Sequence, residues 1–176
     1  MRLRYLIGLA LFGVLTAASP SLAAPPERPV SGTMSGGTTG VASFCTAGTI
    51  STSGSFDATF LGSGTYTGTV TTTSCLFPPF CCGVPSDPYP VDGTFTFSGR
   101  GGSFTAAGSG TGVTNTSAHT DDYTIDLELT IQSGTGRYRH ASGSLAVELL
   151  ATAFLQDGTE GANGTIDGSI TIGGPA

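Results

Sequence analysis

The chain has 176 residues, with six lysine and arginine residues against twelve aspartate and glutamate residues, and a formal net charge of −6. So acidic a chain lacks the basic patches that bind nucleic acid or anionic membranes, and neither is an expected partner. Charged residues make up only 10% of the sequence, and β-branched and aromatic residues are frequent. An intrinsically disordered chain would have fewer β-branched and aromatic residues, so a folded domain is expected. The absence of lysine beside abundant Ala, Gly and Thr is typical of high-GC bacterial proteins.

Residues 1–23 predict a secretory signal peptide. Arg2 and Arg4 precede an apolar run from Tyr5 to Ala18, and small residues at Ser21 and Ala23 mark a cleavage site. The run is too short for a helix rising about 1.5 Å per residue to cross a bilayer of about 30 Å. We therefore expect cleavage after Ala23 and a secreted or extracellular protein.

Residues 24–30 hold three prolines and predict an extended linker, followed by a single domain over residues 31–176. Four cysteines lie in that domain, at Cys45, Cys75, Cys81 and Cys82. An even number in an exported chain indicates two disulfides, and neighbouring cysteines rarely bond each other. Cys45 is therefore expected to pair with Cys81 or Cys82, and Cys75 with the other. The spacing does not suit zinc, so neither a metal site nor a cofactor is expected.

Alternating apolar and polar residues predict strands along the chain. The clearest runs are Tyr123–Ile131, Thr165–Ile172 and Thr94–Ser98, each with one apolar and one polar face. A further run, Leu145–Phe154, is apolar on nearly all positions and predicts a strand covered on both sides. No segment of the domain has a helical period.

These strands recur about every ten residues between Gly- and Ser-rich turns, a pattern typical of a meandering sheet. We expect an all-β, antiparallel fold, an eight-stranded closed barrel, with a β-sandwich as the alternative. A barrel also removes the exposed sheet edges that a Thr- and Val-rich secreted sheet would otherwise present. The chain has no tryptophan and lacks the aromatic girdles of outer-membrane barrels, so no membrane partner is expected.

The segment from Ser133 to Gly143 reads S-G-T-G-R-Y-R-H-A-S-G. It resembles the G-G-T-G-[KR]-F-x-x-A-x-G signature of the dirigent proteins, the allene oxide cyclases and bacterial secreted proteins predicted to share their barrel. The resemblance covers about a dozen residues and departs at Ser133, where the first glycine is usual. It implies a barrel in which this motif forms the turn between two long strands, with the motif residues at Gly134, Thr135, Gly136, Arg137, Tyr138, Ala141 and Gly143.

Few residues suggest chemistry. Arg137, Arg139 and His140 are the candidate ligand contacts. The expected alternative, which the sequence favours, is that the two arginines pair with carboxylates and that His140 is a solvated turn residue. His119 and the acidic residues that follow it lack calcium-loop spacing and predict an ordinary turn. No catalytic triad, nucleophile elbow or phosphate loop appears, so catalytic residues stay unassigned.

Three functions are compatible with the sequence. We favour non-enzymatic binding of a small ligand or an extracellular partner, because no catalytic constellation is visible. The resemblance implies the second, a dirigent- or cyclase-like barrel whose pocket orients a reactive small apolar molecule, which needs little side-chain chemistry. The third is a structural protein of an envelope or matrix. Whether the chain is an enzyme stays open, and the missing motifs favour that it is not.

Overall fold

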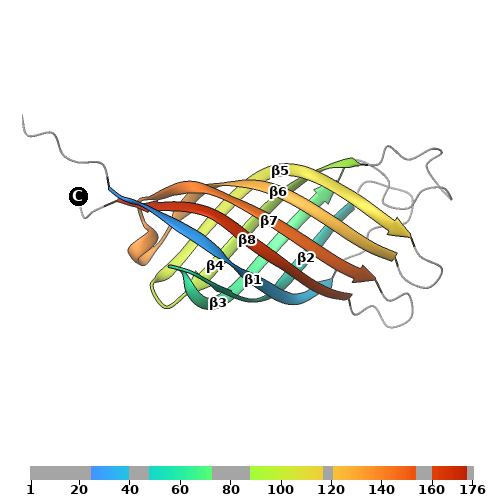
Figure 1. Ribbon diagram of the computed structural model, residues 1–176, viewed down its shortest axis with the longest axis horizontal. Coiled ribbons are helices and arrows are strands. Elements are labelled where there is room, and N and C mark those ends of the chain that lie inside the picture. Colours follow the sequence, from blue (N-terminus) through green and yellow to red (C-terminus); the bar gives the residue numbers. More distant parts are fainter. Residues whose placement is uncertain (1–24, 40–47, 73–87, 117–120, 154–159, 174–176) are drawn as a thin grey trace, which may run out of the picture.

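The computed structural model describes residues 25–39, 48–72, 88–116, 121–153 and 160–173. These residues form a closed antiparallel barrel of eight strands, drawn in Figure 1. The strands are β1 (Glu27–Thr39), β2 (Gly48–Ala58), β3 (Gly62–Thr72), β4 (Tyr89–Gly99), β5 (Gly102–Thr116), β6 (Asp121–Gly134), β7 (Ala141–Ala153) and β8 (Glu160–Ile172). The predicted eight-stranded barrel is therefore confirmed, and the alternative of a sandwich is not.

Each strand pairs with its neighbours in sequence, and β1 closes the barrel by pairing with β8. The register of closure runs from Glu27 opposite Thr171 to Thr38 opposite Glu160. Because the sheet closes, the paired strands leave no free edge that could pair with another chain, as expected from the sequence. No helix in the described residues is long and apolar enough to cross a membrane.

Strand β1 begins at Glu27, so residues 27–30 of the predicted linker belong to the barrel. Pro29 is tolerated there because its strand is paired at that point with β8 alone; pairing with β2 begins at Gly32. The carbonyl oxygen of Pro29 accepts a hydrogen bond from the Thr59 hydroxyl at 3.4 Å. The proline nitrogen faces the same side of β1 as this carbonyl, which is the side toward β2. No strand pairs with β1 on that side at Pro29, so no N–H donor is needed there.

Alternation along the strands sets the inside and the outside of the barrel. In β6, Ile125 and Leu127 are buried and Asp126 is exposed, as the sequence predicted. In β7 the prediction of a strand covered on both sides was wrong, because Leu150 is 46% exposed on the outer face. A single closed sheet has one inner face only, so β7 buries Leu145, Val147 and Leu149 inside the barrel and leaves Glu148 and Leu150 exposed outside.

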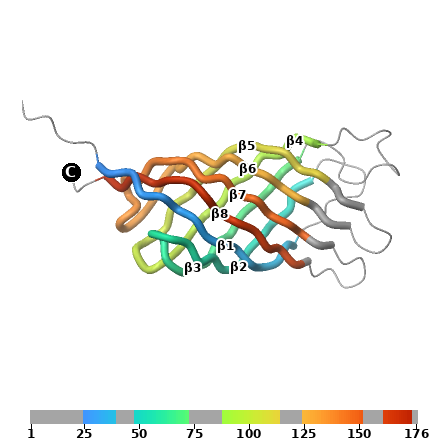
Figure 2. Tube along the Cα trace, viewed as in Figure 1, coloured from blue at the N-terminus to red at the C-terminus, as the bar shows by residue number. Residues whose placement is uncertain are grey.

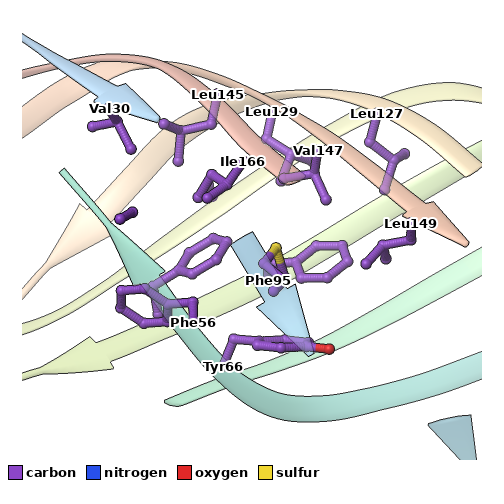
Figure 3. Packing of buried hydrophobic residues seen from close by; sticks show 14 of the residues in the cluster. Val30, Phe56, Tyr66, Phe95, Leu127, Leu129, Leu145, Val147, Leu149 and Ile166 are labelled. Atoms are coloured by element: carbon purple, nitrogen blue, oxygen red, sulfur yellow. The ribbon is translucent and has the colours of Figure 1, made fainter. Parts of the chain in front are cut away.

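The barrel interior is packed with side chains. Its largest fully buried members are Tyr66, Phe95, Phe97, Phe104, Leu129, Leu145, Ile166, Ile170, Val30 and Val147. Figure 3 shows aromatic rings from one side of the barrel packing against leucine, valine and isoleucine from the other. Glycines on the inner face make room for these groups, since a Cβ at Gly68 would lie 2.5 Å from the Phe95 ring. This interior is a core and not an open channel.

A few hydroxyls interrupt the apolar interior. Thr52 donates to the carbonyl of Gly37 at 3.2 Å, and Thr72 donates to the carbonyl of Pro90 at 3.2 Å. The Thr52 hydroxyl also lies 3.4 Å from the hydroxyl of Tyr66. Backbone carbonyls and a neighbouring side chain thus compensate these groups for the loss of water.

Candidate binding cleft at one end of the barrel

One end of the barrel collects three connections that are far apart in sequence. They are residues 59–61 between β2 and β3, residues 100–101 between β4 and β5, and residues 135–140 between β6 and β7. The start of β1 and the end of β8 lie at the same end, as Figures 1 and 2 show. We call this the turn end.

The predicted turn motif lies where expected, between β6 and β7, and contains a single 3₁₀ turn, η1 (Gly136–Tyr138). Gly136 has φ of 56°, in the left-handed region that favours glycine. A side chain at Gly134 would overlap the carbonyl of Tyr138, so the motif's glycines are required by backbone geometry. Thr135 accepts a hydrogen bond from the Ser103 N–H at 3.0 Å, which fixes the turn against β5.

Tyr138 is a core residue. Its side chain is 2% exposed and its ring centroid lies 5.3 Å from that of Phe104. It therefore closes the lumen at the turn end. Ala141, also in the motif, is partly buried against the core, and Gly143 has φ of 141°, where a side chain would be strained.

Arg137 joins the three connections. Its backbone N–H donates to the carbonyl of Gly101 at 2.9 Å. Its Nη2 donates to the carbonyl oxygens of Phe60 at 2.9 Å and Leu61 at 3.5 Å, and to the hydroxyl of Tyr138. Among the described residues, two backbone carbonyls and a hydroxyl accept hydrogen bonds from this guanidinium, where the sequence suggested a carboxylate.

Two aromatic rings flank the same guanidinium. The Cζ atom of Arg137 lies 4.7 Å from the centroid of the Tyr138 ring and 5.4 Å from that of Phe60. Both distances are within the range of cation–π attraction. A side chain at Gly101 would overlap the Arg137 stem, so this glycine lets the arginine cross the β4–β5 turn.

Phe60 is the one described non-glycine residue with a positive φ, at 63°. Such a conformation costs a bulky side chain about 1–3 kcal/mol, and strain of this kind gathers at functional sites. Its ring is also 38% exposed, one of two large exposed apolar side chains in the described chain. No residue pattern points to this strain, because D-A-T-F-L-G carries no turn residue at the strained position.

A cleft of about 470 Å³ opens at the turn end. It is lined by Phe60, Leu61, Gly62, Ser63, Arg100, Gly101 and Arg137. The lining includes two arginines, an aromatic ring and no carboxylate. All four arginines of the described chain lie at this end, in β1, the β4–β5 turn and the β6–β7 turn, whereas most carboxylates lie along the strands. The cleft is therefore suited to a negatively charged group.

The remaining candidate residues of the motif lie outside the cleft lining. Arg139 and His140 are both exposed, and the His140 carbonyl accepts a hydrogen bond from the Gly173 N–H at 3.4 Å. His140 thus ties the β6–β7 turn to the end of β8 through its backbone. Of the three predicted ligand contacts, only Arg137 lines the cleft, and Phe60 and Arg100 were not predicted.

Several predictions lie outside the described residues. Cys45, Cys75, Cys81 and Cys82 are among these, so the two disulfides stay a prediction, and so does the role of His119. Within the described part of the chain, no group of three or more His, Cys, Asp or Glu side chains could hold a metal ion.

Two other outer surfaces differ in chemistry from the turn end. On β6–β8 a groove of about 450 Å³ is lined by the carboxylates of Asp126, Glu128, Glu148 and Asp167. Asp126 stands directly opposite Glu148 in the register, a like-charge pair that opposes folding. We assign no ligand to this groove.

The outer face of β2–β5 carries mainly the hydroxyl groups of threonine and serine side chains. On β3 the outward-facing Thr65, Thr67, Thr69 and Thr71 form a row that lies opposite further threonines and serines on β2 and β4. The hydroxyls of Thr49 and Thr71 are 3.2 Å apart, and those of Thr96 and Thr105 are 3.1 Å apart. Threonine suits an exposed strand, and these pairs stabilise the sheet.

Comparison of the chain with protein-family models, with curated proteins and with solved structures finds no match. The resemblance to the dirigent and allene oxide cyclase barrels therefore stays a prediction based on the turn motif.

Proposed function

We propose that this chain is an exported, non-enzymatic barrel that binds a small ligand or an extracellular partner on its outer surface. The observation that carries the proposal is the packed interior. Phe95, Leu129 and Leu145 are fully buried at its centre, and no titratable carboxylate or histidine is among the described core residues. Ligand contact is then left to the outer faces and the two ends.

The packed interior gives less support to the dirigent- or cyclase-like alternative. A barrel that orients a reactive small apolar molecule needs an apolar pocket large enough to enclose it. In the described interior such space is taken by side chains, for example by the rings of Phe97 and Phe104, whose centroids lie 5.1 Å apart. A structural role in an envelope or matrix would instead require self-association, which sedimentation at several concentrations measures.

Native mass spectrometry of the protein recovered from the medium of cells expressing residues 1–176 tests the proposal. We expect a mature chain that begins at Ala24 and carries a noncovalently bound molecule or protein. After release, that compound should be chemically unchanged when it is incubated again with fresh protein. Retention of residues 1–23, or conversion of the compound to a product, would contradict the proposal.

A further inference from the structure

We infer that the turn-end cleft is a binding site for small aromatic carboxylates. The inference rests on the proposed binding function and names the ligand class and the place. The carboxylate would lie between Arg100 and Arg137, and the ring of the ligand would lie against Phe60.

The charge of the cleft selects an anion. Arg100 is exposed, and its side chain makes no hydrogen bond or ion pair with another described residue, so its planar donor fork is available. No carboxylate lines the cleft to compete for it. An incoming carboxylate would therefore gain charge-assisted hydrogen bonds without displacing an internal ion pair.

The second arginine is held in place before any ligand arrives. Arg137 uses Nη2 on the carbonyls of Phe60 and Leu61 and on the Tyr138 hydroxyl, and its stem lies over Gly101. A guanidinium has five N–H donors, and those on Nε and Nη1 have no described acceptor. Because its rotamers are already restricted, Arg137 loses little further entropy when a ligand binds.

Phe60 selects an aromatic ligand. Glycine would adopt φ of 63° without strain, as Gly62 does nearby at 76°, so the turn itself does not need a phenylalanine. The phenyl ring is partly exposed, lies beside a guanidinium and forms the apolar wall of the cleft. A flat ligand ring can stack on it, while the attached carboxylate reaches the arginines.

Titration calorimetry of the mature chain with 2-naphthoate tests the inference. We expect binding to be measurable with 2-naphthoate, and weaker by at least tenfold with the uncharged 2-naphthamide or with acetate, which lacks the ring. Arg100→Gln should weaken 2-naphthoate binding at least tenfold. Arg139→Gln, which removes a neighbouring exposed arginine outside the cleft, is the matched control and should leave the affinity unchanged.

Phe60→Gly separates ligand binding from fold stability. It relieves the backbone strain while removing the aromatic wall, so we expect Tm to stay within about 3 °C and 2-naphthoate binding to weaken severalfold or more. Equal affinities in Arg100→Gln and Arg139→Gln, or no binding of 2-naphthoate at millimolar concentration, would overturn the inference. If mass spectrometry still finds another bound molecule, the proposed function survives and this ligand class alone fails.

Discussion

Replacing Phe97 by alanine tests whether the barrel interior is a packed core. The Phe97 side chain is 1% exposed, and its ring centroid lies 5.1 Å from Phe104, 5.6 Å from Phe56 and 6.1 Å from Phe95. Truncation of a buried phenylalanine costs about 3–5 kcal/mol, through lost transfer free energy and the cavity left behind. With about 2–4 °C per kcal/mol for a domain of this size, Tm should fall by about 6–20 °C.

Urea unfolding followed by far-ultraviolet circular dichroism and tyrosine fluorescence measures this loss, since the chain has no tryptophan. The midpoint should fall while the m value stays constant. Ser98→Ala, at the neighbouring exposed position, is the matched control and should change the free energy of unfolding by less than about 0.5 kcal/mol. A loss below about 1 kcal/mol for Phe97→Ala would refute the packed core and favour a solvated lumen.

Three further substitutions test the outer surfaces and the glycines. Glu148→Gln removes the like charge opposite Asp126 and should raise the free energy of unfolding by about 0.2–1 kcal/mol at low salt. An equal gain at 1 M salt, where surface charges are screened, would contradict an electrostatic cause. Arg137→Met should lower the free energy of unfolding by about 1–2 kcal/mol and speed amide exchange at residues 59–61. Unchanged exchange there would argue that Arg137 does not hold the β2–β3 turn against the β6–β7 turn. Gly110→Ala places a Cβ onto the carbonyl of Asp126 and should cost at least about 1 kcal/mol in urea unfolding, whereas a neutral effect would argue against this close strand approach.

Some features of this protein follow from neighbouring residues alone. The alternation of Tyr123–Ile131 and Thr165–Ile172 indicated strands with one buried face, because successive side chains of a strand point to opposite sides. The glycines of residues 134–143 indicated a reversal between two strands, since left-handed backbone is open to glycine at low cost. Both predictions needed no knowledge of distant contacts.

The cleft, in contrast, depends on barrel closure. Arg137 and Phe60 are 77 residues apart, and only the pairing of β2 through β7 around the barrel brings their turns together. The same closure left Leu150 exposed, although its apolar surroundings in sequence predicted a covered strand. The alternation of apolar and polar residues indicates which face of a strand is buried, because the direction of each side chain is a local property of the pleat. The number and register of the strands that close the barrel decide which turns lie side by side. They thereby also decide which residue has a strained backbone conformation.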